Sequence, residues 1–199
     1  MSRRTGLRLL LAATLLLAVA RPALAHEQAG QAQGFLTGFL HPLSGPDHVV
    51  AMIAVGLWGA QLGLPAVWLL PVAFPMMMAL GGFLGLVGVP LPGVEIGIAL
   101  SALLLGMMVA RESKPPLAVA VSLVGLFAVF HGHAHGTELP PGQSGLAYSI
   151  GFVVATGMLH GIGIAVGVVH RWPAGRIALR AAGGAVALAG VAFLWRALA

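Results

Sequence analysis

Long apolar stretches alternate with short segments that hold proline, glycine and charged residues, and this alternation predicts a bundle of membrane-spanning helices. Crossing a bilayer as a helix takes roughly 20 residues. Short turns such as Val89-Pro-Leu-Pro-Gly93 separate the apolar stretches. We predict six spans, at residues 34–63 (beginning at Gly34 or at Pro46), 66–87, 94–110, 117–136, 144–169 and 177–198.

The first 25 residues are expected to be a separate segment. A basic front precedes the apolar core Leu9–Ala20, which is too short to span comfortably, and an A-x-A motif ends at Ala25. We therefore predict a cleavable signal peptide at residues 1–25 and a six-helix transmembrane domain at residues 26–199. An uncleaved anchor helix is the alternative. Cleavage would expose His26, whose imidazole and α-amine can together chelate a divalent ion.

The composition agrees with a chain that lies almost wholly in the membrane. Of its 199 residues, 59% are hydrophobic and 8% are charged, whereas soluble domains average about 25% charged residues. No segment is polar and long enough for a soluble catalytic or nucleotide-binding domain. The absence of cysteine excludes disulfides, thiolate metal ligands and a cysteine nucleophile.

The positive charge predicts the orientation of the bundle. The net charge of +5 comes from arginines near the ends of spans, so we expect an orientation signal and no nucleic-acid partner. The basic loops at residues 111–114 and 171–176 should be cytoplasmic. The mature N-terminus is then periplasmic, as in a multi-pass protein of a bacterial inner membrane. The aromatic residues expected in the interfacial belt are Trp58, Trp68, Trp172, Trp195 and Tyr148.

Three polar residues cluster at the beginning of the first span, in Gly38-Phe-Leu-His41-Pro-Leu-Ser-Gly-Pro-Asp47-His48. Pro42 is expected to push His41 out of helical geometry, and Pro46 to restart the helix with Asp47 and His48 in its first turn. Ionisable groups at membrane depth usually mark an ion or substrate path. Histidine with carboxylate suits a divalent transition metal. Alternatively, Asp47 only favours the helix N-terminus and the histidines are interfacial.

A second polar cluster, Phe130-His-Gly-His-Ala-His-Gly-Thr-Glu138, closes the fourth span. Because a helix turns about 100° per residue, His131, His135 and Glu138 fall within roughly 60° of one another. His133 points the other way and is more consistent with packing. The predicted topology places both clusters at the outer membrane face, so two distant segments would present ligands together. The alternative is an exposed polar helix end.

His160 lies alone in the middle of the fifth span, in Gly157-Met-Leu-His160-Gly. It is either a metal ligand or a buried histidine satisfied by an interhelical hydrogen bond, and the sequence leaves both readings open. Glu95, near the outer end of the third span, is either a partner of the ligands or an interfacial charge.

The two clusters resemble the motifs of a known family. His41-Pro-Leu-Ser-Gly-Pro-Asp47-His48 is similar to the signature of the HupE/UreJ family, and the stretch from Phe130 to Glu138 is similar to its second motif. The resemblance covers the whole chain. It implies a nickel or cobalt permease, not an enzyme, that serves hydrogenase or urease maturation. The metal-handling positions that it implies are His41, Asp47, His48, His131, His135 and Glu138.

From this resemblance we expect transported Ni²⁺ or Co²⁺ and no permanently bound cofactor. Membrane lipid surrounds the protein, and a metallochaperone or a second copy of the chain is an expected partner. Nothing in the motifs distinguishes nickel from cobalt. The rival hypothesis is an intramembrane zinc-dependent hydrolase, in which the histidines and Asp47 hold zinc and activate water. Its general acid or base would have to be Glu95 or Ser101. A metal-sensing or chaperone membrane subunit is a third hypothesis.

Overall fold

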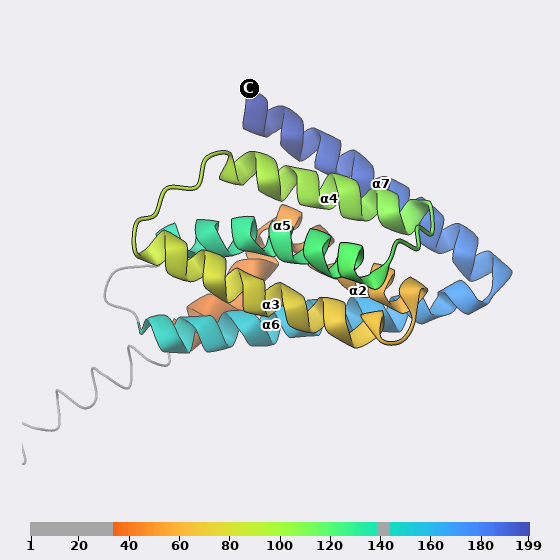
Figure 1. Ribbon diagram of the computed structural model, residues 1–199, viewed down its shortest axis with the longest axis horizontal. Helices are drawn as coiled ribbons and strands as arrows, with labels where there is room; N and C mark the ends of the chain where they lie inside the picture. The colour runs from red at the N-terminus through yellow and green to blue at the C-terminus, as the bar shows by residue number, and fades with distance from the viewer. Residues whose placement is uncertain (1–33, 139–143) are drawn as a thin grey trace, which may run out of the picture.

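The computed structural model describes residues 34–138 and 144–199, and every regular element in these ranges is helical (Figure 1). A helix at residues 34–44 is followed by the labelled helices. These are α2 (Pro46–Leu62), α3 (Ala66–Leu86), α4 (Val94–Ala110), α5 (Leu117–Thr137), α6 (Gly145–Gly167), the 3₁₀ helix η1 (Val168–Arg171) and α7 (Pro173–Leu198). The expected signal peptide and His26 lie outside the described residues.

Four helices of the described ranges are long and apolar enough to cross a membrane: α3, α5, α6 with its η1 extension, and α7. The helix α4 is apolar but shorter, with 17 residues. The chain is therefore an all-helical integral membrane protein, and the count of six spans stays a prediction. Most helix bounds agree with the expected ones. The exception is α7, which begins at Pro173 rather than at residue 177, because proline is favoured at the first helical position.

The first span is broken at Gly45, and not at His41 as expected. Residues 34–44 form one helix that continues through His41 and Pro42. The Ser44 hydroxyl donates to the His41 carbonyl at 2.6 Å and closes this last turn. Gly45 has extended backbone angles (φ −93°, ψ 110°), because the residue before a proline avoids the α region. The restart at Pro46, with Asp47 in the first turn of α2, is as predicted.

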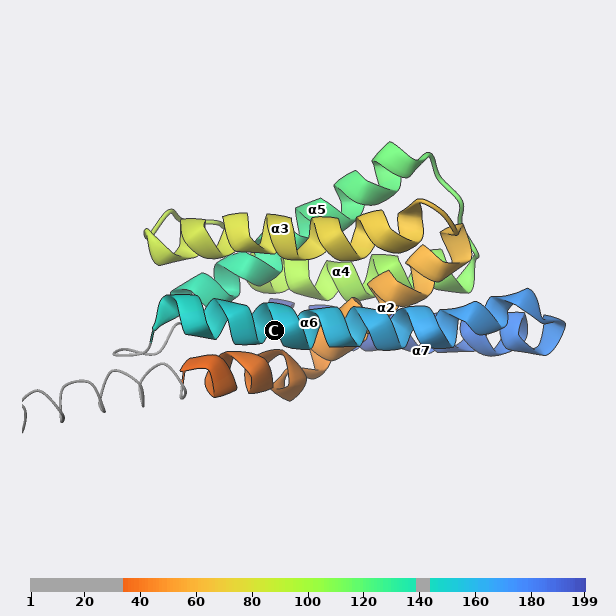
Figure 2. The same ribbon diagram turned by 90° about the horizontal axis from the view of Figure 1, so that it is seen from below.

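The helices pack mainly in three pairs, and no pair joins neighbours in the sequence. The most extensive contacts are those of α3 with α5, α4 with α7, and α2 with α6. Figures 1 and 2 show that α3 and α5 run in the same direction, as do α2 and α6. Short loops make successive helices antiparallel, so two parallel helices must be separated in the sequence by an odd number of helices. The helix α2 also contacts α3, α4 and α7, and it is buried on nearly all sides from Ala51 to Gln61.

Two glycines bring α2 and α6 into close contact. A Cβ atom added at Gly56 would collide with the carbonyl oxygen of His160, and one added at Gly163 would collide with that of Ile53. Small residues permit such close approach between membrane helices. The approach places His160 directly beside the backbone of α2.

The expected aromatic belt is correct only in part. Trp68, Trp172 and Trp195 are exposed, in agreement with an interfacial position. Trp58 and Tyr148 are buried instead. Trp58 can be buried without loss of its hydrogen bond, because its indole N–H donates to the Ser113 carbonyl at 2.9 Å inside the protein.

Candidate metal-binding site

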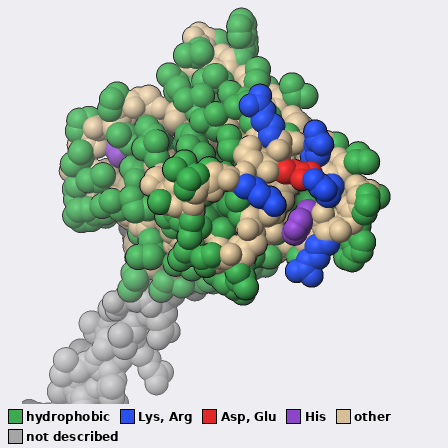
Figure 3. Space-filling view, turned by 45° about the vertical axis from the view of Figure 1, so that its right-hand side comes forward, with side chains coloured by type: hydrophobic (Ala, Val, Ile, Leu, Met, Phe, Trp, Pro, Cys, Tyr) green, Lys and Arg blue, Asp and Glu red, His purple; other side chains and the backbone are tan. Residues whose placement is uncertain are grey.

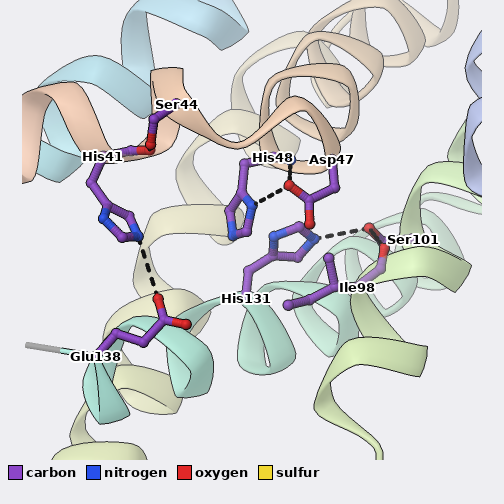
Figure 4. A network of polar contacts seen from close by, with 8 residues as sticks. All are labelled: His41, Ser44, Asp47, His48, Ile98, Ser101, His131 and Glu138. Atoms are coloured by element: carbon purple, nitrogen blue, oxygen red, sulfur yellow. Dashed lines mark hydrogen bonds and ion pairs between the residues drawn. The ribbon is translucent and has the colours of Figure 1, made fainter. Parts of the chain in front are cut away.

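The two polar clusters meet at one end of the bundle, as the topology predicted. The ring of His48 in α2 lies 4.7 Å from the ring of His131 and 4.6 Å from that of His135, both in α5. The ring of His41 lies 4.7 Å from that of His135. Figure 4 shows His48 and His131 pointing toward one another from their two helices. Four imidazoles from distant parts of the sequence therefore form one continuous group.

Asp47 determines which nitrogen of His48 carries the proton. Its Oδ1 atom lies 2.9 Å from both the backbone nitrogen and the Nδ1 atom of His48. A carboxylate only accepts, so Nδ1 is the protonated nitrogen and Nε2 keeps its lone pair. His48 Nε2 is buried and has no hydrogen-bond partner among the described residues. Carboxylate–histidine pairs of this kind orient the ligands of metal sites.

Ser101 of α4 likewise determines which ring nitrogen of His131 carries the proton. The Ser101 hydroxyl donates its only proton to the carbonyl of Ile98 at 2.6 Å. Its oxygen must therefore accept from His131 Nε2, at 2.9 Å. This leaves the lone pair on His131 Nδ1, which is buried without a partner in the described part of the chain.

The outer part of the group contains a set of atoms that can hold one ion. One donor atom from each of His41, His135 and Glu138 lies within 4.8 Å of the other two. His41 Nε2 is 3.5 Å from Glu138 Oε2, and no described residue is hydrogen-bonded to either ring nitrogen of His135. Imidazole with carboxylate suits divalent transition metals.

Exposure falls from the carboxylate of Glu138 toward the interior. The side chain of Glu138 is 55% exposed and that of His41 31%, whereas that of His48 is 11% exposed. His131 is fully buried. Glu138 and Asp47 supply negative charge at the more exposed level, so a cation that arrives from solvent first meets the carboxylate.

His160 is separated from this group by a phenylalanine ring. The ring of Phe74 in α3 lies 5.6 Å from that of His131 and 5.3 Å from that of His160. His160 Nδ1 donates to the Met52 carbonyl at 2.8 Å, so Nε2 keeps the lone pair. This Nε2 is also buried and unpartnered among the described residues. The interhelical hydrogen bond expected for His160 is confirmed. Its second nitrogen has no partner among the described residues, so a role as metal ligand stays a prediction.

The structure confirms that His133 lies apart from the stripe. Its Nε2 donates to the carbonyl of Val89, in the α3–α4 connection, at 2.7 Å. Phe74 and Tyr148 also lie beside the group and were not assigned to it from the sequence, whereas Ser101 was considered there only as an acid or base of the hydrolase hypothesis. Only the packing of the helices shows that these three side chains contact the histidines. Glu95 lies exposed in the first turn of α4.

These features define a helical membrane protein whose interior holds a line of oriented imidazoles with carboxylates at one end. The chain belongs to the HupE/UreJ family: the family described as HupE / UreJ protein matches residues 14–193. The Protein HupE of Rhizobium leguminosarum bv. viciae is 50% identical over 182 residues, which cover 91% of this chain and 95% of that protein. No solved structure matches the chain significantly.

Proposed function

We propose that this protein is a permease that imports nickel or cobalt across a bacterial inner membrane for hydrogenase or urease maturation. One observation carries the proposal: His48, His131 and His160 each have one nitrogen occupied by an oriented partner and the other buried with a free lone pair. Membership of the HupE/UreJ family supports it.

The arrangement fits a path better than a permanent site. The ion would meet Glu138 and His41 first and then pass to His48 and His131, with Phe74 between these ligands and His160. Each stage offers few ligands, most of them neutral. Conduction requires binding that is strong enough for entry and weak enough for release. The ion is therefore cargo, and a metallochaperone that receives it remains a prediction.

The hydrolase hypothesis has less support. Ser101 is fully buried, and its hydroxyl is engaged by Ile98 and His131, so it is unavailable as an acid or base toward a substrate. Glu95, the other candidate, is exposed at the beginning of α4. His131 is also fully buried. A substrate would therefore have to enter the interior of the bundle to meet a water molecule activated at this histidine.

The proposal is tested by uptake of radioactive nickel and cobalt into intact cells that lack their own high-affinity uptake. Cells that express this chain should accumulate one of the two ions, and competition by the other, by zinc and by copper gives the selectivity. His41→Ala, Asp47→Ala and His48→Ala should each reduce uptake at least about tenfold, since changes even to the partners of metal ligands cost about 10–100-fold.

His133→Ala is the matched control, because it removes a buried histidine of the same helix that lies outside the group. Uptake by this variant should stay within about twofold of wild type at equal protein level in the membrane. Equal loss at His133 and His131 would contradict the proposed path. Normal uptake by the His48→Ala variant would exclude it.

A further inference from the structure

A second polar site lies at the other end of the bundle, where the basic loops gather. A cavity of about 230 Å³ opens there, lined by Gln61, Glu112, Lys114, His170, Arg171 and Arg176. Figure 3 shows Lys and Arg side chains gathered around acidic and histidine side chains on this part of the surface. The positive-inside rule places this end in the cytoplasmic leaflet. The site is separate from the histidine group, which lies at the opposite end of α2.

The wall of this cavity is held in place by side chains of α2. Trp58 Nε1 donates to the carbonyl of Ser113 at 2.9 Å, and Gln61 Nε2 donates to that of Val109 at 3.2 Å. Both bonds fix the end of α4 and the loop that follows. Gln61 also lines the cavity. Its Oε1 atom is buried and has no hydrogen-bond partner in the described part of the chain.

Glu112 occupies a position that normally requires glycine. Its φ of 51° is left-handed, and the bond from Ser113 N to the Met108 carbonyl at 3.0 Å marks a Schellman helix end. A non-glycine residue there is strained. Its carboxylate accepts two hydrogen bonds at Oε2 from Arg176, from Nη2 at 2.7 Å and from Nε at 3.2 Å, and these bonds lower the pKa of Glu112. Glu112 is thus ionised near neutral pH, and its ion pair with Arg176 holds the α4–α5 loop against α7.

This ion pair leaves a surplus of positive charge around the cavity. Arg176 forms an ion pair with Glu112, whereas Lys114 and Arg171 form no ion pair with a described residue. The surplus disfavours a metal cation and favours an anion. Gln61 Oε1 requires a donor, because a carbonyl oxygen of an amide only accepts. A ligand that satisfies both conditions carries a negative group and a hydroxyl.

We propose that this cavity binds the headgroup of an anionic phospholipid whose phosphate lies between Lys114 and Arg171 and whose glycerol hydroxyl donates to Gln61 Oε1. Phosphatidylglycerol has this chemistry. Anionic lipids at a membrane surface attract basic residues, and the cavity opens at the end of the bundle that meets the headgroups. The inference goes beyond metal transport and does not depend on it.

The test measures lipid binding to the purified full-length chain in detergent, by native mass spectrometry and by the rise in melting temperature. The added probes are phosphatidylglycerol, phosphatidic acid, phosphatidylcholine and inorganic phosphate. Wild type should bind phosphatidylglycerol most tightly, then phosphatidic acid, and phosphatidylcholine weakly. The variant with Lys114→Gln and Arg171→Gln should bind phosphatidylglycerol about 30-fold more weakly. This is the loss expected when two basic residues that each attract an anionic lipid are removed.

The matched control carries Arg111→Gln and Arg196→Gln, two exposed cations that do not line the cavity, and its lipid binding should equal that of wild type. Gln61→Met should keep phosphatidic acid binding and lose the preference for phosphatidylglycerol. Equal weakening in the control, or equal binding of phosphatidylcholine, would overturn the proposal. Stabilisation by inorganic phosphate without any by phosphatidylglycerol would overturn the lipid assignment.

Discussion

Hydrogen bonds from neighbouring side chains determine which nitrogen of His48 and of His131 is free to bind a metal ion. Asp47 and Ser101 each occupy one nitrogen of a neighbouring imidazole, at 2.9 Å in both cases. The remaining nitrogen is then a lone-pair donor that needs no rearrangement before it meets a cation. Ser101 has this effect only because its own proton is committed to Ile98.

Replacement of Ser101 by alanine should therefore reduce metal uptake by about 10–100-fold, although the serine touches no metal in the proposed path. The variant leaves His131 Nε2 buried without a partner and frees the ring to take either tautomer. Ser101→Thr retains the hydroxyl and should restore most of the uptake. The measurement is nickel or cobalt uptake at equal protein level. If alanine and threonine variants behaved alike, the hydroxyl would have no part in orienting His131.

At the scale of helices, proline and glycine positions predicted most bounds, and periodicity predicted the stripe of His131, His135 and Glu138. The break was predicted at His41 rather than at Gly45, because the segment contains two X-Pro pairs and either could end the helix. The hydrogen bond from the Ser44 side chain that closes the last turn cannot be read from the sequence pattern. The pairing of α2 with α6 was not predictable, since helices apolar on all sides give no direction for packing. For the same reason the positions of Phe74 and Tyr148 required the structure.

The contact between α2 and α6 is expected to be sensitive to a single methyl group. Gly163→Ala would place a Cβ against the Ile53 carbonyl, so it should destabilise the bundle by about 1–3 kcal/mol and separate His160 from Met52. The measurement is thermal unfolding in detergent, together with uptake. Gly157→Ala, in the same helix, meets no atom within 4 Å and should have little effect. Comparable loss at both positions would mean that helix propensity, and not the contact, is responsible.

At the scale of the whole molecule, the two ends of the bundle differ in charge. One end has the carboxylates of Asp47 and Glu138 with the histidines, and the other has the basic loops and the Glu112–Arg176 pair. This asymmetry predicts that the basic end faces the cytoplasm. It also means that an arriving cation and an anionic headgroup would be recognised on opposite faces.

Reporter fusions test this orientation directly. Fusions within residues 111–114 and 171–176 should report a cytoplasmic position, and a fusion at residue 138, next to the histidine group, should report a periplasmic one. The reason is the excess of lysine and arginine in the first two loops. A periplasmic signal from either basic loop would reverse the direction of the proposed transport.

The pairing of helices has a consequence for how the protein is made. The helix α3 packs chiefly on α5, α2 on α6 and α4 on α7. Each of α2, α3 and α4 is therefore synthesised before the helix that it packs against. A nascent chain that ends after α5 already contains the α3–α5 pair and the six residues expected to handle the metal, but it lacks α6 and α7, the partners of α2 and α4. The α2–α6 and α4–α7 pairs should therefore form only near the end of synthesis, and chains that stop after α5 should be open to quality-control proteases.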